Sequence, residues 1–203
     1  MALRRSSVDV DLTGLARHAA RLDRYSPAQM QTVLKRSAGT LVRRLPVEAS
    51  RLVSSEILNV PRLKVRPLLS ARSSGAQGQV AIILSGLRNR IPLHQFSGAK
   101  YGGRKTAGAV VQVWRDSPPK VYDRYASKKD TAVFAIKGRG VKSGLYQRIH
   151  NRKGERAPIV QRKGPELWRA ITDREHGDIY PQLIGFSDEV LRSERARLLK
   201  VGR

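Results

Sequence analysis

The chain has 203 residues, of which 40 are Lys or Arg and 16 are Asp or Glu, so its formal net charge at neutral pH is +24. Hydrophobic residues make up 40% of the sequence, which is enough for a small folded core. The absence of cysteine excludes disulfide bonds, thiolate metal sites and cysteine nucleophiles. A positive charge of this size favours association with a polyanion, and nucleic acid is the first candidate.

The sequence has no pattern typical of secretion or of a membrane span. Asp9 and Asp11 lie where a signal peptide needs an uninterrupted apolar run. The longest stretch without a charged residue, Ser73 to Leu87, has 15 residues and is rich in Ser, Gly and Gln. It is too short and too polar to cross a bilayer. We therefore expect a soluble protein.

The N-terminal part of the chain is predicted to be helical. Apolar residues have helical spacing over residues 12–24, and Ser26 followed by Pro27 is typical of an N-cap and a first helical residue. From there the apolar stripe continues to Ile57. Pro46 interrupts this second helix, and because the stripe keeps its phase beyond the proline, we expect a kink and not a break.

The remaining chain is predicted to contain short strands and two more helices. Residues 59–78 are rich in Pro, Ser and basic residues, as in a connector with at most a short helical turn. The segments with strand patterns, each bounded by Gly, Pro or Ser, are Val80–Leu84, Ala109–Trp114, Ala132–Ile136 and Leu145–His150. The two helices are expected to begin at Gly164-Pro165-Glu166 and at Asp178, the second ending near Lys200.

These patterns predict an α+β fold in which a small antiparallel sheet is flanked by a long kinked N-terminal helix and by C-terminal helices. We expect one structural domain with three regions. They are a helical region over residues 1–58, a basic sheet with long loops over residues 59–175, and a C-terminal helix over residues 176–203.

Positive charge is concentrated in the expected sheet region. Between Val60 and Lys163 there are 23 Lys and Arg but only four Asp and Glu, a net charge of +19. The alternative is that these charges only keep the protein soluble. Positive charges crowded in this way repel one another, however, and a polyanion that neutralises them explains their concentration better. The cations expected to lie near nucleic acid are Arg88, Arg90, Lys100, Arg104, Lys105, Lys128, Lys129, Lys137, Arg139, Lys142, Arg152 and Lys153.

The mode of contact expected is electrostatic. Few aromatic residues accompany the basic loops apart from Tyr101, Tyr122 and Tyr125, so stacking on single-stranded bases is less favoured than contact with duplex phosphates. Such contact does not depend on base sequence.

No catalytic motif is complete. Gly98, Gly103 and Lys105-Thr106 approach a phosphate-binding loop, but Arg104 breaks the spacing and a strand is expected where such a loop needs a helix. His150-Asn151 suggests a nuclease, yet the sequence lacks an acidic cluster to hold a metal ion. We predict no enzymatic activity, no cofactor and no metal.

The order of several short blocks resembles a known protein family. The blocks are Ile91-Pro92-Leu93 with Phe96, Val133-Phe134-Ala135-Ile136, Gly144 with Arg148, and Pro158-Ile159 with Gly164-Pro165. In this order they resemble the minor tail protein Z family of tailed bacteriophages, over about residues 30–175. The segments 115–130 and 160–163 depart from the family's pattern, which leaves the local loop shapes open.

The resemblance implies a structural virion protein of a long-tailed phage. It would be a tail-completion or head–tail joining subunit, acting as a homo-oligomeric ring, hexameric by analogy with the tail, around the DNA channel at the head-proximal end. Its partners would be a tail terminator or tail tube protein, a head connector or stopper protein, and viral double-stranded DNA. It would be located in the virion's tail or neck, and in the host cytoplasm during assembly.

The resemblance also suggests roles for the segment 144–167. Its apolar positions, Leu145, Ile149, Ile159 and Leu167, would be core or subunit-interface residues. Its cations Arg148, Arg152, Lys153 and Arg156 would face either DNA or an acidic neighbour. The alternative to a joining subunit is a free-standing protein that binds DNA or RNA without sequence preference.

Overall fold

The computed structural model describes residues 5–10, 26–75, 80–87, 90–101, 109–122, 133–138, 141–148, 159–172 and 176–201. The protein has an α+β fold that divides into two compact units. Unit 1 comprises Met1–Leu52, Arg66–Arg88 and Asp178–Arg203, and unit 2 comprises Val53–Val65 and Asn89–Gly177. Unit 1 gathers parts of all three regions expected from the sequence.

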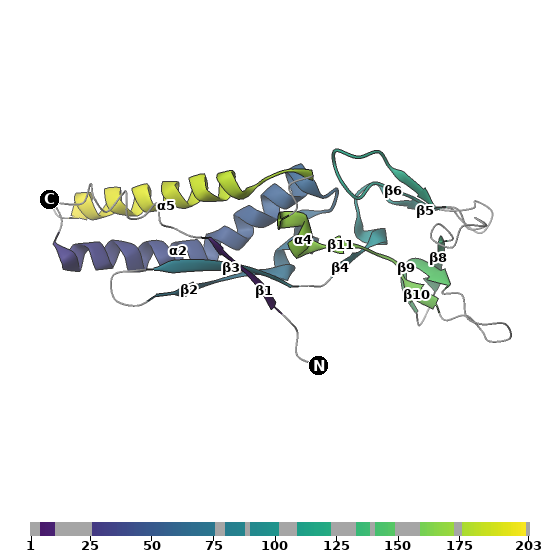
Figure 1. Ribbon diagram of the computed structural model, residues 1–203, viewed down its shortest axis with the longest axis horizontal. Helices are drawn as coiled ribbons and strands as arrows, with labels where there is room; N and C mark the ends of the chain where they lie inside the picture. Colours follow the sequence, from purple (N-terminus) through teal and green to yellow (C-terminus); the bar gives the residue numbers. More distant parts are fainter. Residues whose placement is uncertain are drawn as a thin grey trace. The chain divides into compact units, whose positions relative to one another are not determined.

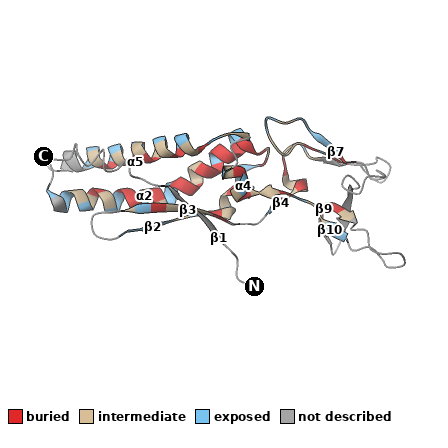
Figure 2. Ribbon diagram, viewed as in Figure 1, coloured by how far each residue is buried: buried red, intermediate tan, exposed pale blue. Residues whose placement is uncertain are grey.

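Unit 1 is built around a pair of long helices. Helix α2, Pro27–Leu52, lies beside helix α5, Tyr180–Val201, and packs also on strands β2, Leu69–Ser74, and β3, Ala81–Leu87 (Figure 1). Strand β1, Arg5–Val10, completes an antiparallel sheet of order β1-β3-β2. Figure 2 shows the buried residues of α2 along one stripe of the helix, as the apolar spacing of the sequence predicts.

The start of α2 confirms the predicted cap. The backbone N–H of Gln29 donates to Ser26 Oγ at 3.3 Å, and the backbone N–H of Ser26 donates to Gln29 Oε1 at 3.0 Å. This reciprocal pair is a capping box, with Pro27 as the first helical residue. The helix continues through Pro46 to Leu52, so the proline does not break it. The helix predicted over residues 12–24 lies outside the described residues.

The connector predicted over residues 59–78 is partly wrong. It contains the expected short helical turn, α3 at Arg62–Val65, and a 3-10 turn, η2 at Arg66–Leu68, but then the strand β2. Strand β2 pairs with β3 from Leu69, opposite Gly86, to Ser74, opposite Ala81. Its sequence, LSARSS, has little strand preference, so backbone pairing with the apolar strand β3 decides its conformation.

The described residues of unit 2 form three small antiparallel sheets, where one sheet was expected. The described strands of this unit have from two to eight residues. The sheets are β11-β4, β5-β6-β7 and β10-β9-β8, formed by β4, Arg90–Pro92; β5, Lys100–Tyr101; β6, Ala109–Val111; β7, Lys120–Tyr122; β8, Val133–Gly138; β9, Val141–Arg148; β10, Ile159–Gln161; and β11, Lys163–Glu166.

Short helical segments complete unit 2. They are the π-helical turn η1, Val53–Ile57, the 3-10 turn η3, Leu93–Gln95, and helix α4, Leu167–Thr172. Helix α4 packs against η1, and η3 packs against β9. The core of the unit is apolar and its fully buried side chains include Val53, Ile57, Leu58, Val111, Leu145 and Leu167.

The helix expected to open at Gly164-Pro165-Glu166 begins three residues later. Glu166 lies opposite Arg90 in the β11-β4 pair, and its carboxylate is 3.2 Å from the Arg90 guanidinium. Gly164 lies against the Phe96 ring. These contacts with β4 and η3 hold Pro165 and Glu166 in an extended conformation, so that α4 starts at Leu167.

Candidate nucleic-acid interface

Four of the twelve predicted nucleic-acid-proximal cations lie among the described residues: Arg90 in β4, Lys100 in β5, Lys137 in β8 and Lys142 in β9. The other eight, Arg88, Arg104, Lys105, Lys128, Lys129, Arg139, Arg152 and Lys153, lie outside them.

Two of the four cations come together at one end of a hairpin. Strands β8 and β9 pair in antiparallel register up to Gly138, opposite Val141, and the register shifts between Ile136 and Gly138. Lys137 on β8 and Lys142 on β9 therefore both lie at the irregularity, between the last two pairs of the register. The backbone places these two lysines near the same turn of unit 2, whereas Lys100 belongs to a different sheet.

Arg90 forms an ion pair with a carboxylate of unit 2. Its guanidinium donates to Glu166 Oε1 at 3.2 Å, and both side chains are partly exposed. Such an exposed pair contributes little to stability, but it reduces the charge available to phosphate. Arg90 is thus positioned by the β11-β4 register.

Additional cations, which the sequence did not single out, lie around Tyr122 and His94. The Lys120 ammonium lies 5.5 Å from the centroid of the Tyr122 ring, within the range of a cation–π contact. Burial raises the pKa of Tyr122, and the charge of Arg162 opposes that rise. The pKa of His94 is lowered by burial and, to a smaller extent, by the charge of Lys64. Lys120 and Tyr122 are two residues apart on β7, whereas only the folded chain brings Arg162 near Tyr122 and Lys64 near His94.

The four apolar positions assigned to core or interface have separate locations. Leu145 and Leu167 are fully buried within unit 2, so they act as core residues and offer no surface to another subunit. Ile159, in contrast, is substantially exposed on β10. Ile149 lies outside the described residues.

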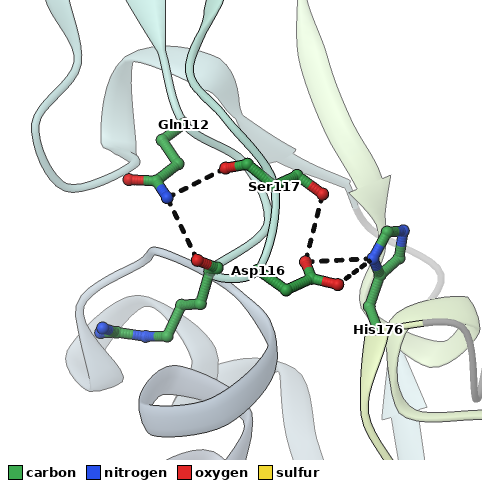
Figure 3. A network of polar contacts seen from close by, with 5 residues as sticks. Gln112, Asp116, Ser117 and His176 are labelled. Atoms are coloured by element: carbon green, nitrogen blue, oxygen red, sulfur yellow. Dashed lines mark hydrogen bonds and ion pairs between the residues drawn. The ribbon is translucent and has the colours of Figure 1, made fainter.

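A polar cluster in unit 2 joins the segment between β6 and β7 to His176 (Figure 3). The His176 ring stacks on Trp114, and its Nδ1 lies 3.0 Å from Asp116 Oδ2 and 3.2 Å from Asp116 Oδ1. Ser117 Oγ donates to Asp116 Oδ1 at 3.2 Å. The hydrogen bond with His176 is the largest cause that lowers the pKa of the Asp116 carboxyl.

The turn that carries Asp116 is held by side-chain amides. Gln112 Nε2 donates to the carbonyl oxygens of Arg115 and Ser117, at 3.2 and 3.0 Å (Figure 3). Asn59 Nδ2 donates to Gln112 Oε1 at 3.2 Å and to the Ser97 carbonyl at 3.0 Å. The carboxylate is therefore fixed relative to the core of unit 2.

Within this cluster, the Ser117 hydroxyl is directed at the carboxylate and not at the imidazole ring. An aspartate–histidine pair can act as a base when a nucleophile lies against the imidazole. Here the hydroxyl of Ser117 donates its single proton to the carboxylate and not to the ring. No local motif in the sequence indicates the cluster, because Trp114 and Asp116 lie some sixty residues before His176.

Two further questions are whether the described residues could bind a metal ion or span a membrane. Within this part of the chain, no group of three or more His, Asp or Glu side chains is placed to hold a metal ion. Among the same residues, no helix is both long enough and apolar enough to cross a membrane.

Comparisons with known proteins add no assignment. A scan against protein-family models gave no match, and searches of curated proteins and of solved structures gave no significant match.

Proposed function

We propose that this protein is a structural virion component of a long-tailed phage, a tail-completion or head–tail joining subunit that forms a ring around the DNA channel. The single observation that carries the proposal is the net charge of +19 between Val60 and Lys163, within the segment whose sequence blocks resemble the minor tail protein Z family. A ring would place this charge around one axis, where phosphates neutralise it.

The proposed contact with DNA is independent of base sequence. Lysine and arginine side chains on short strands and loops neutralise phosphates without reading base edges. This mode of binding allows DNA to slide through the ring during ejection. The protein acts in this proposal by binding and assembly, without catalysing a reaction.

The test is a phage strain in which the gene for this chain is deleted. We expect the strain to make filled heads and tail tubes that fail to join into infectious particles, and electron microscopy would show them separately. Complementation with the wild-type gene should restore joined particles. Normal infectivity of the deletion strain would refute the proposal.

The second candidate is a free-standing nucleic-acid-binding protein, which the net charge of +24 favours independently of any resemblance. Sedimentation and duplex binding separate the two candidates. A monomer that binds duplex DNA tightly in isolation supports the second candidate. Weak binding in isolation, together with assembly on purified tail tubes, supports the joining subunit.

A further inference from the structure

The imidazole of His94 has one nitrogen in the interior of unit 2 that lacks a polar partner. His94 lies in the turn η3, which is anchored by the buried side chains of Leu93 and Phe96. Its Nδ1 atom is buried and makes no hydrogen bond with any of the described residues. Because a buried polar atom without a partner costs free energy, this contact is maintained at some expense of stability.

The Nδ1 atom lies against the backbone of β9 at Gly144. A Cβ atom at this buried glycine would be 3.1 Å from His94 Nδ1 and 2.7 Å from Nε2 of Gln161, on β10. The imidazole therefore packs beside two strands of the sheet β10-β9-β8. The contact is possible because position 144 has no side chain.

Two backbone hydrogen bonds link η3 to β9 beside this contact. The Leu93 N–H donates to the Arg162 carbonyl at 3.1 Å, and the Arg162 N–H donates to the Leu145 carbonyl at 2.8 Å. Arg162 lies between β10 and β11, and Leu93 directly follows β4. His94 thus lies where the sheet β10-β9-β8 is joined to the sheet β11-β4.

The groups around His94 favour a neutral imidazole. Burial lowers the pKa of His94, and the charge of Lys64, on α3, lowers it further. From the strands, the Gln161 amide and the Tyr146 ring lie beside Gly144, and Arg162 carries the charge of the bridge.

None of these four neighbours is negatively charged at neutral pH. Protonation of the ring would place a hydrogen and a positive charge at Nδ1, an atom without a hydrogen-bond partner among the described residues. The closed contact therefore disfavours the charged form of His94.

We propose that His94 is an acid-sensitive contact, in which protonation of the imidazole releases η3 from β9 and uncouples the sheet β11-β4 from the sheet β10-β9-β8. In the opened form the ring meets water, where the pKa of histidine is about 6.5. The opened form then binds a proton more readily than the closed form, so opening becomes easier as the pH falls below about 6.5. The inference depends on the fold of unit 2 and not on a role in the phage tail.

Hydrogen exchange followed by NMR tests this release. The amides of Leu93 and Arg162 report it directly, because their hydrogen bonds form the bridge. After division by the intrinsic exchange rates, we expect exchange up to about tenfold faster at about pH 5.5 than at about pH 7.5, since one pH unit below the pKa of a free imidazole corresponds to about tenfold. The amides of Asn59 and Arg115, bonded to backbone carbonyls elsewhere in unit 2, should not share this response.

Three variants of the full chain locate the response. His94→Phe keeps a planar ring but cannot titrate, so it should abolish the pH dependence. His176→Phe is the matched control, because it removes another histidine of unit 2 and keeps a ring against Trp114; it should respond as the wild type does. Lys64 is exposed, and Lys64→Gln should reduce the response, because the pKa of His94 in the closed form then moves nearer to that of a free imidazole.

Equal exchange of the Leu93 and Arg162 amides at the two pH values in the wild type would overturn the proposal. A pH response that persists in His94→Phe would also overturn it, as would a response shared by the Asn59 and Arg115 amides, which would indicate unfolding of the whole unit. If His94→Phe does not fold, Lys64→Gln decides, and a response as large as that of the wild type would overturn the proposal.

Discussion

The imidazole ring of His176 stacks on the indole ring of Trp114, with 3.9 Å between the ring centroids and 18° between the planes. His176 Nδ1 also lies 3.0 Å from Asp116 Oδ2, within hydrogen-bonding distance. Gly177, which follows it, has a φ of +127°, a conformation that side chains rarely adopt. Stacking and a hydrogen bond thus fix His176, near the end of unit 2, to the turn after β6. Gly177 allows the backbone conformation that follows His176.

The Asp116–His176 contact predicts a specific pH dependence. The hydrogen bond from His176 is the main cause that lowers the pKa of Asp116 in the folded state. A carboxyl whose pKa falls on folding stabilises the protein above its unfolded pKa of about 4, and this contribution disappears as the pH falls through the folded pKa. We therefore expect Asp116→Asn to lower stability at neutral pH and to reduce the further loss of stability on acidification.

Tryptophan fluorescence during denaturant unfolding measures this effect. Both tryptophans, Trp114 and Trp168, belong to unit 2, so the signal reports that unit. The control is Glu189→Gln, which removes an exposed acidic residue from α5 and should leave the signal unchanged. If Asp116→Asn loses as much stability on acidification as the wild type, the contact does not contribute.

Gly164 is predicted to tolerate no side chain without a change in the core of unit 2. A Cβ atom there would lie 2.6 Å from Cζ and 2.8 Å from Cε2 of the buried Phe96 ring. We expect Gly164→Ala to destabilise unit 2 by about 1–3 kcal/mol, as overpacking of a core does. The same fluorescence assay measures the destabilisation, and Phe96→Leu in the Gly164→Ala background should recover part of it.

Gly39→Ala is the corresponding control in a helix. A Cβ at Gly39 meets no atom within 4 Å, and the residue is exposed in α2. Replacing a mid-helix glycine with alanine should stabilise unit 1 by up to about 1 kcal/mol. A Gly164→Ala variant as stable as the wild type would show that the Phe96 ring has room to move.

Pro46 is predicted to destabilise helix α2. It lies inside α2, where it supplies no backbone N–H for the helix. We expect Pro46→Ala to retain the fold and to stabilise the helix by up to about 3 kcal/mol. Hydrogen exchange measured by mass spectrometry should show slower exchange of the amides of α2.

Pro181 provides the control for this prediction. It lies in the first turn of α5, ahead of the hydrogen bond from the Leu183 N–H to the Ile179 carbonyl. A backbone N–H at this position has no partner within the helix, so Pro181→Ala should bring little gain. Loss of assembly in Pro46→Ala with a retained fold would indicate that the proline-dependent shape of α2 is required.

The cations of the segment 100–105 are predicted to set the salt dependence of DNA binding. Replacing Lys100, Arg104 and Lys105 with Ala should reduce the slope of log affinity against log salt by up to about 0.9 for each phosphate that is no longer neutralised. The control replaces Lys35, Arg36 and Arg192, exposed cations of unit 1, and removes the same charge. An equal slope in the two variants would show that Lys100, Arg104 and Lys105 do not contact phosphate individually.

Local sequence determined the helical elements best. Ser26, Pro27 and Gln29 form a capping box from adjacent residues, and the apolar stripe of α2 follows from helical spacing alone. The last helix was expected from Asp178 and begins at Tyr180. The charge excess between Val60 and Lys163 is likewise a property of the sequence and requires no fold.

Only the tertiary structure determined two kinds of feature. They are the strands whose sequences have little strand preference, and the contacts between side chains far apart in the sequence. Strand β2 forms because β3 offers a complementary backbone edge, and Glu166 stays extended because Arg90 lies opposite it. The stack of His176 on Trp114 joins residues that no local pattern relates. Helical caps and stripes depend on neighbours within a few residues, whereas strand pairing and side-chain stacking depend on partners that only the folded chain brings within reach.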